Sequence, residues 1–82
     1  MLLAVDLGLS TGLAAFGRDG KLRWCRSHHY ATRATLKRAV FSVLDGLPEG
    51  EALALEGGGP LALPWQREAA RRGLIVLTVQ AH

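Results

Sequence analysis

The sequence is short and contains little that would crosslink it or hold it in a membrane. It has 82 residues and one cysteine, Cys25, which excludes an internal disulfide and favours a reducing cytoplasm. No apolar run approaches the roughly 20 residues that a membrane-spanning helix needs. The amino terminus lacks a basic region and reaches the acid Asp6 early, so we expect no signal peptide. We therefore expect residues 1–82 to form a single cytoplasmic domain with a thin core.

Acidic residues are fewer than basic ones, with 7 Asp and Glu against 10 Lys and Arg and a net charge of +3. Such a field attracts phosphate backbones, so Lys21, Arg23 and Arg67 are candidate nucleic-acid contacts. On charge alone, a solvated Arg-rich surface is the favoured interpretation. The basic residues form two groups along the sequence, and Asp19 is the only acid within the stretch that holds the first group. The first group is Arg18, Lys21, Arg23, Arg26, Arg33, Lys37 and Arg38, and the second is Arg67, Arg71 and Arg72.

The first third of the chain has the pattern of three antiparallel strands. Residues 2–6 form an apolar run, and residues 13–16 form another after a glycine-containing turn. Asp19-Gly20 is a strong hairpin signal. Residues 21–27 then alternate between two faces, as in a half-exposed strand.

Helices and strands alternate in the rest of the chain. Thr32 is the expected N-cap of a helix that Gly46 and Pro48 end. Residues 52–55 form a strand, residues 64–73 a second helix, and residues 74–79 a last strand that we expect to be buried on both faces. The order strand, strand, strand, helix, strand, helix, strand predicts an α/β fold with a mixed sheet.

Two of the predicted strands end in a carboxylate that glycine follows closely. Asp6 precedes Leu7-Gly8, and Glu56 precedes Gly57. Each acid alone is most simply a helix cap or a loop residue, but the repeated pattern favours a shared site. Two carboxylates held close together are costly unless a cation lies between them or one of them is protonated. Their oxygens suit Mg²⁺ or Mn²⁺ as the cation. Metals held in this way activate water and stabilise the leaving oxygen of a phosphodiester.

The other residues with reactive side chains lack suitable neighbours in the sequence. His28 and His29 have no further histidine or cysteine at metal-ligand spacing, so we expect both on the surface. Cys25 has no obvious base nearby and is expected to be structural. Trp24 and Trp65 are expected to pack in or beside the core.

The segment Leu-Ala-Val-Asp6-Leu-Gly8-Leu-Ser-Thr-Gly12-Leu-Ala resembles the first hairpin of RuvC-like Holliday-junction resolvases, which belong to the ribonuclease-H-like superfamily. The segment Ala-Leu-Glu56-Gly57 is similar to the strand of that family that bears its second acid. Residues 66–79 resemble the following helix and fifth strand. The resemblance covers essentially the whole chain.

This resemblance implies a metal-dependent endonuclease that acts on branched DNA as a homodimer. It implies a sheet in which Asp6 and Glu56 lie on adjacent, roughly parallel strands, and it assigns the metal-bridging role to Asp6 and the second ligand to Glu56. The family also places acids on a helix after the fifth strand, and this sequence ends at His82 before any such helix. We therefore expect a carboxy-terminally incomplete domain that is not a competent nuclease by itself, and whose last strand a second copy covers.

Two other interpretations are open. Asp6-Leu-Gly8-Leu-Ser10-Thr11-Gly12 is also close to the first phosphate loop of sugar-kinase, actin and heat-shock-chaperone ATPases, although those proteins need two domains. Alternatively, the chain is a non-catalytic module that has a nuclease-like fold and binds nucleic acid or a protein partner.

Overall fold

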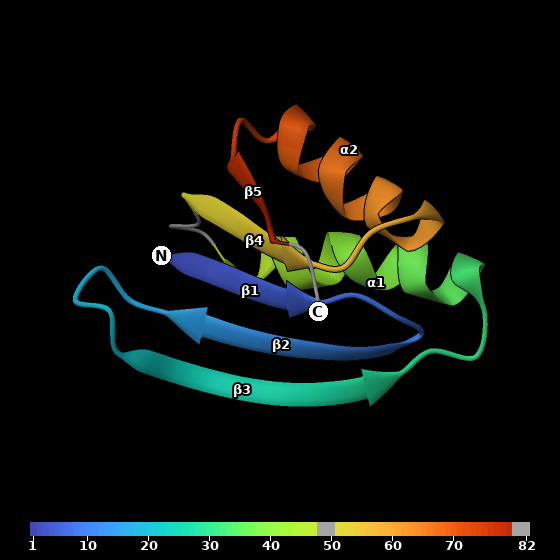
Figure 1. Ribbon diagram of the computed structural model, residues 1–82, viewed down its shortest axis with the longest axis horizontal. Coiled ribbons are helices and arrows are strands. Elements are labelled where there is room, and N and C mark those ends of the chain that lie inside the picture. Colours follow the sequence, from blue (N-terminus) through green and yellow to red (C-terminus); the bar gives the residue numbers. More distant parts are fainter. Residues whose placement is uncertain (48–50, 80–82) are drawn as a thin grey trace.

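The computed structural model describes residues 1–47 and 51–79. In these ranges the chain forms five strands, two α-helices and a short 3₁₀ turn (Figure 1). Their bounds are β1 (Leu2–Asp6), β2 (Ser10–Phe16), β3 (Leu22–His29), α1 (Arg33–Asp45), β4 (Ala52–Glu56), η1 (Pro60–Ala62), α2 (Leu63–Arg71) and β5 (Ile75–Val79).

The strands form one mixed sheet in the order β3-β2-β1-β4-β5. β1 pairs antiparallel with β2, and β2 with β3, whereas β1–β4 and β4–β5 are parallel pairs. The predicted α/β mixed sheet is thus confirmed. The antiparallel strands β2 and β3 are joined by the expected hairpin turn. In this turn Gly20 has a φ of 78°, and the Lys21 amide donates a hydrogen bond to Asp19 Oδ1.

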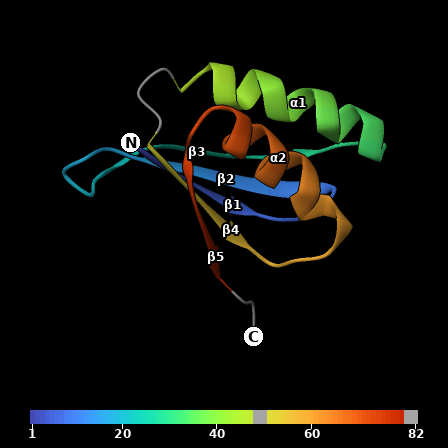
Figure 2. The same cartoon turned by 90° about the horizontal axis from the view of Figure 1, so that it is seen from above.

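Both helices cover the same face of the sheet (Figure 2). Side chains alternate along each strand, so the odd-numbered positions of β1, β2 and β4 enter the core while the even-numbered positions point to the opposite, open face. Trp65 of α2 is 1 % exposed, as expected for a core tryptophan. The core consists mainly of Leu3, Val5, Leu13, Ala15, Leu36, Val40, Leu44, Leu53, Leu55, Trp65 and Ala69.

The helix ends follow local capping rules. Thr32 caps α1 as predicted, because its side chain accepts a hydrogen bond from the Thr35 amide. Gly46 is the C-cap of the same helix, and the expected stop at Pro48 lies outside the described residues. A proline lies in the first turn of α2, where its missing amide hydrogen costs no hydrogen bond.

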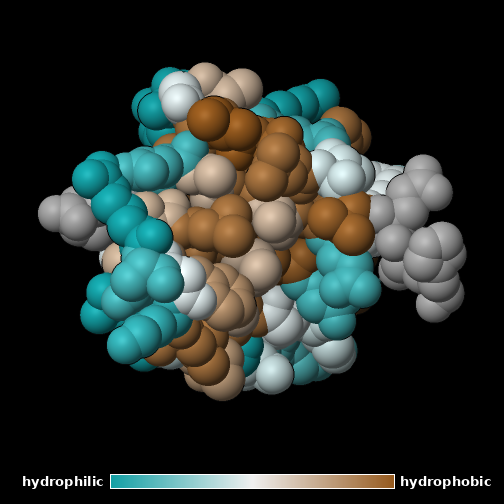
Figure 3. Space-filling view, turned by 60° about the vertical axis from the view of Figure 1, so that its left-hand side comes forward, coloured by the Kyte–Doolittle hydropathy of each residue, from teal (hydrophilic) through white to brown (hydrophobic). Residues whose placement is uncertain are grey.

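The prediction that the last strand is buried on both faces was wrong. β5 is an edge strand, and Ile75, Leu77 and Val79 are 63 %, 50 % and 53 % exposed. These side chains lie on the open face because they pair with Ala52, Ala54 and Glu56 of β4. None of the described elements covers that face. Hydrophobic residues therefore reach the molecular surface, as seen in Figure 3.

Candidate metal centre

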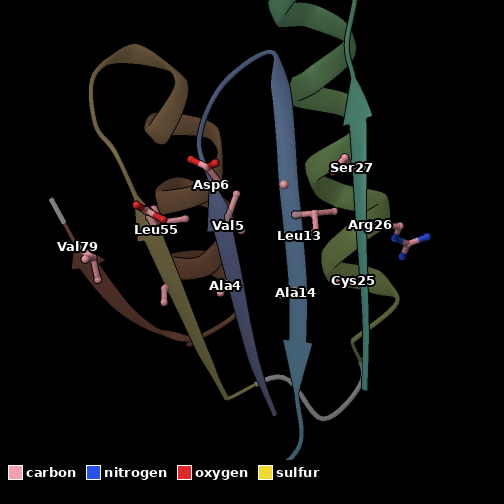
Figure 4. Close-up of a pocket in the computed structure, with 13 residues that line it drawn as sticks. Ala4, Val5, Asp6, Leu13, Ala14, Cys25, Arg26, Ser27, Leu55 and Val79 are labelled. Carbon is pink, nitrogen blue, oxygen red and sulfur yellow. The ribbon is translucent and has the colours of Figure 1, made fainter. Parts of the chain in front are cut away.

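Asp6 and Glu56 are side-by-side on the open face of the sheet. They are register partners at the carboxyl ends of β1 and β4, which pair in parallel. Neighbouring strands lie about 4.8 Å apart, so the two carboxylates project from adjacent points of one sheet edge. The prediction of adjacent parallel strands is confirmed. Both residues are solvent-exposed, and Figure 4 shows Asp6 at the end of β1.

The alternation of each strand fixes the direction of these two side chains. Leu3 and Val5 enter the core from β1, which turns Asp6 to the opposite face. Leu53 and Leu55 do the same for Glu56 in β4. Burial of the leucine and valine side chains thus also keeps both acids on the open face, because a shift of either strand by one residue would turn its carboxylate into the core.

Small residues leave open space in front of the carboxylates. Gly12 of β2 pairs with Asp6, and a methyl group added at Gly12 would lie 3.4 Å from Asp6 Cβ. The open face is hollowed there by a cavity of about 430 Å³ (Figure 4). Its lining comes from four strands and the end of β5: Ala4, Val5, Asp6, Gly12, Leu13, Ala14, Cys25, Arg26, Ser27, Ala54, Leu55, Glu56 and Val79.

Most of these lining residues were not predicted from the sequence. Ala4 and Ala54 precede Asp6 and Glu56 by two positions, so each lies on the same face as its acid. Small residues at these matched positions were the available signal for a hollow. Cys25 and Ser27 carried no such signal, because only the pairing of β3 with Ala14 and Gly12 of β2 brings them there.

The hydroxyl groups in and next to the turn between β1 and β2 form hydrogen bonds within the protein. Thr11 is 1 % exposed, and its Oγ1 donates to the Gly8 carbonyl at 2.6 Å. Ser10 Oγ lies 2.9 Å from Nδ1 of His29, an exposed residue as predicted. Both hydroxyls therefore already have a hydrogen-bond partner inside the protein.

The described residues bring no third ligand to the carboxylate pair. No group of three or more His, Cys, Asp or Glu side chains is placed to hold a metal in residues 1–47 and 51–79. The other described acids form ion pairs elsewhere, Asp19 with Arg23, Asp45 with Arg72, Glu51 with Arg18, and Glu68 with Arg71 and Arg72.

The three candidate nucleic-acid contacts do not gather around the carboxylates. Lys21 and Arg23 lie at the hairpin, near the end of the sheet where Leu2 pairs with Phe16, whereas Asp6 is at the other end of β1. Arg67 belongs to α2, on the face of the sheet opposite Asp6 and Glu56.

No protein-family model matches this chain, and no curated protein is similar to it. In the described ranges, neither helix is long and apolar enough to cross a bilayer.

The donor set fits a hard divalent cation. Two neighbouring carboxylates offer oxygen ligands, and the cavity before them leaves space for the water molecules that Mg²⁺ retains. Asp6 and Glu56 would hold the ion. When bound, the metal would act as a Lewis acid toward a phosphodiester.

Proposed function

We propose that this chain is a RuvC-like, ribonuclease-H-like domain that binds Mg²⁺ or Mn²⁺ through Asp6 and Glu56 and acts on branched DNA as a cytoplasmic homodimer. The observation that carries the proposal is the pairing of Asp6 with Glu56 at the carboxyl ends of β1 and β4. Asp6 and Glu56 form no ion pair with the other described residues, and they lie on an open, hollowed sheet face; such an arrangement suits a phosphodiester-cleaving metal site better than a structural one.

The protein groups act on the metal and its surroundings in simple ways. Asp6 and Glu56 neutralise the cation and fix its position at the sheet edge. Gly12 gives room beside Asp6, and the alanines of the cavity keep large side chains away from the approaching substrate. A two-metal mechanism needs at least one further carboxylate, so the 82-residue chain should bind metal and DNA without robust hydrolysis.

Iron-directed cleavage tests the placement of DNA at this metal without requiring complete catalysis. Fe²⁺ replaces Mg²⁺ at oxygen sites, and with ascorbate and peroxide it releases hydroxyl radicals that cut nearby DNA. We expect discrete cuts in a bound four-way junction, suppressed by excess Mg²⁺ and lost in Asp6→Asn and Glu56→Gln. Asp19→Asn, which changes an acid at the hairpin, should preserve the cuts. Diffuse cutting, or the same cuts in all variants, would contradict the proposal.

A non-catalytic module is the second candidate, favoured by the pair of carboxylates standing without a third ligand in the described part of the chain. The two functions differ in whether Asp6 and Glu56 support hydrolysis once a further carboxylate completes the metal site. Mg²⁺-dependent cleavage of the junction by the 82-residue chain, lost in Asp6→Asn, would establish a competent enzyme. If the junction also stays uncut when a separate peptide that carries further carboxylates is added to the chain, the non-catalytic module is favoured.

The ATPase alternative is weakened by the turn after β1. A phosphate loop needs free hydroxyl and amide donors, but Thr11 is buried and donates to the Gly8 carbonyl. We therefore expect ATP with Mg²⁺ to give no more thermal stabilisation than Mg²⁺ alone.

A further inference from the structure

A second cavity lies on the other side of the molecule, between the two helices. It measures about 440 Å³ and is lined by Arg33, Lys37, Phe41, Pro60, Leu63, Pro64, Arg67 and Glu68. We call this the α1–α2 groove. Both helices cover the core face of the sheet (Figure 2). The groove between them therefore lies on the side of the molecule opposite to the open face that bears Asp6 and Glu56.

The floor of the groove is apolar and open to solvent. Phe41 is 42 % exposed and Leu63 is 45 % exposed, so both present apolar surface to solvent. The remaining apolar lining comes from Pro60 and Pro64. A concave apolar surface with charged rims is typical of sites that receive side chains of a partner.

The rim of the groove carries positive charge that no acid in the described part of the chain compensates. Arg33 and Lys37 are one helical turn apart on α1, and Arg67 faces them from α2. None of these three forms a salt bridge with an acid in the described ranges, unlike Arg18, Arg23, Arg71 and Arg72.

Glu68, the one acid among the described residues that line the groove, is already neutralised. The Glu68 side chain is 7 % exposed, receives hydrogen bonds from Arg71 and Arg72, and therefore presents little free negative charge. Arg72 also pairs with Asp45 at the end of α1, which ties the two helices together at that end of the groove. The groove thus combines an apolar surface with a basic rim, and the Asp45–Arg72 ion pair links the two helices that form it.

We propose that the α1–α2 groove binds a short acidic amphipathic helix of a partner protein. The apolar face of the helix would cover Phe41 and Leu63, and its carboxylates would pair with Arg33, Lys37 and Arg67. From Arg33 to Phe41, α1 rises by about 12 Å, which matches two turns of a bound helix. This inference is independent of the proposed metal site.

A second copy of this chain does not fit the groove well. Of its described acids, Asp19, Asp45, Glu51 and Glu68 are in ion pairs, and Asp6 and Glu56 lie beside the open face of the sheet. Nucleic acid fits less well than a peptide, since a sugar–phosphate strand would leave Phe41 and Leu63 exposed to water.

Fluorescence anisotropy with labelled synthetic peptides tests this inference. The probes are 14-residue helical peptides with Leu or Phe at i, i+3, i+4 and i+7 and Glu at the flanking positions. Matched controls are a Glu-to-Gln version, a scrambled version of the same composition, and a 14-nucleotide single strand. We expect micromolar binding of the acidic peptides only, and absence of binding by all of them at about 1 mM would overturn the proposal.

Variants of the 82-residue chain locate the binding. Lys37→Glu and Arg67→Glu should each weaken peptide binding about tenfold or more, and so should Phe41→Ala. Arg38→Glu makes the same charge change at the neighbouring exposed position of α1, outside the groove lining, and should leave affinity unchanged. Circular dichroism confirms that each variant is folded. Equal losses in Arg38→Glu, no loss in Phe41→Ala, or tighter binding of the oligonucleotide at the groove would overturn the inference.

Discussion

Asp6 and Glu56 lie fifty positions apart in the chain and are direct neighbours across the β1–β4 pair. Neither forms an ion pair with a basic side chain in the described ranges, although the other described acids all do. Two like charges on adjacent strands repel each other. The arrangement is therefore costly for the protein alone and favourable once a cation is shared.

Metal binding should reverse the effect of this pair on stability. We expect Mg²⁺ or Mn²⁺ to raise the Tm of the 82-residue chain with increasing concentration, because a ligand of the folded state stabilises it. Asp6→Asn should abolish this shift and, in the absence of metal, leave Tm equal or higher, since the repulsion is relieved. Scanning calorimetry with Asp19→Asn as the control measures both effects. A Tm shift that persists in Asp6→Asn would place the metal elsewhere.

Binding to a DNA junction should depend steeply on salt if the hairpin charges contact phosphates. Each phosphate contact contributes a slope of about −0.9 in log K against log salt concentration. Lys21→Glu should therefore make the slope shallower by about 0.9, the contribution of one phosphate contact. Arg23→Glu should change the slope in the same direction, and it also replaces the Arg23–Asp19 ion pair by repulsion between two acids. Arg38→Glu on α1 serves as the matched charge change. Identical slopes for all of these proteins would show that the hairpin charges are a solvated surface.

The open face of β5 should drive self-association. Ile75, Leu77 and Val79 are each at least half exposed, and a second copy, packed or swapped, would remove them from water. We expect a dimer by sedimentation equilibrium and a monomer for Leu77→Lys. Leu63→Lys introduces the same charge at a 45 % exposed leucine on the helical side and should still dimerise. A monomeric wild-type chain at high micromolar concentration would contradict this prediction.

Acid should destabilise the protein through Glu68. The hydrogen bond from Arg71 holds the pKa of the Glu68 carboxyl below its ordinary value of 4.5, with Arg72 adding to the effect and burial opposing it. A carboxyl whose pKa is lower in the folded state stabilises the fold above its unfolded pKa, and this contribution is lost as the pH falls through the folded value.

Urea titrations at neutral pH and at about pH 3 measure this loss. Glu68→Gln should make unfolding free energy less dependent on pH in that window. The pKa of Glu51 is also lowered, by its hydrogen bond and charge interaction with Arg18, but the Glu51 side chain is 50 % exposed and the pair is screened. Glu51→Gln is therefore the matched control and should change the pH dependence less. The reverse order would show that the buried cluster does not govern acid stability.

Local patterns in the sequence were sufficient to predict most elements of this fold. Thr32 as an N-cap, Asp19-Gly20 as a hairpin, and the apolar runs that end in Asp6 and Glu56 are all found where these patterns placed them. Capping, turn geometry and side-chain alternation depend on residues within a few positions of one another, so the chain itself encodes them. The adjacency of the two acids was predicted from the repeated strand–acid–glycine pattern and from the family resemblance. Local patterns alone do not determine it, because parallel strands of one sheet share their carboxyl ends without having to be neighbours.

Only the tertiary structure decided which surfaces are covered. Residues 74–79 look like a buried strand because they are apolar, but β5 lies at the sheet edge with Ile75 and Leu77 exposed. The α1–α2 groove likewise depends on how α1 packs beside α2, which brings Lys37 and Arg67 to one rim. The sequence by itself determined the elements and the direction of each side chain relative to its own strand or helix. Burial, cavities and charge clusters depend on contacts between distant segments, and these exist only once the sheet and helices have assembled.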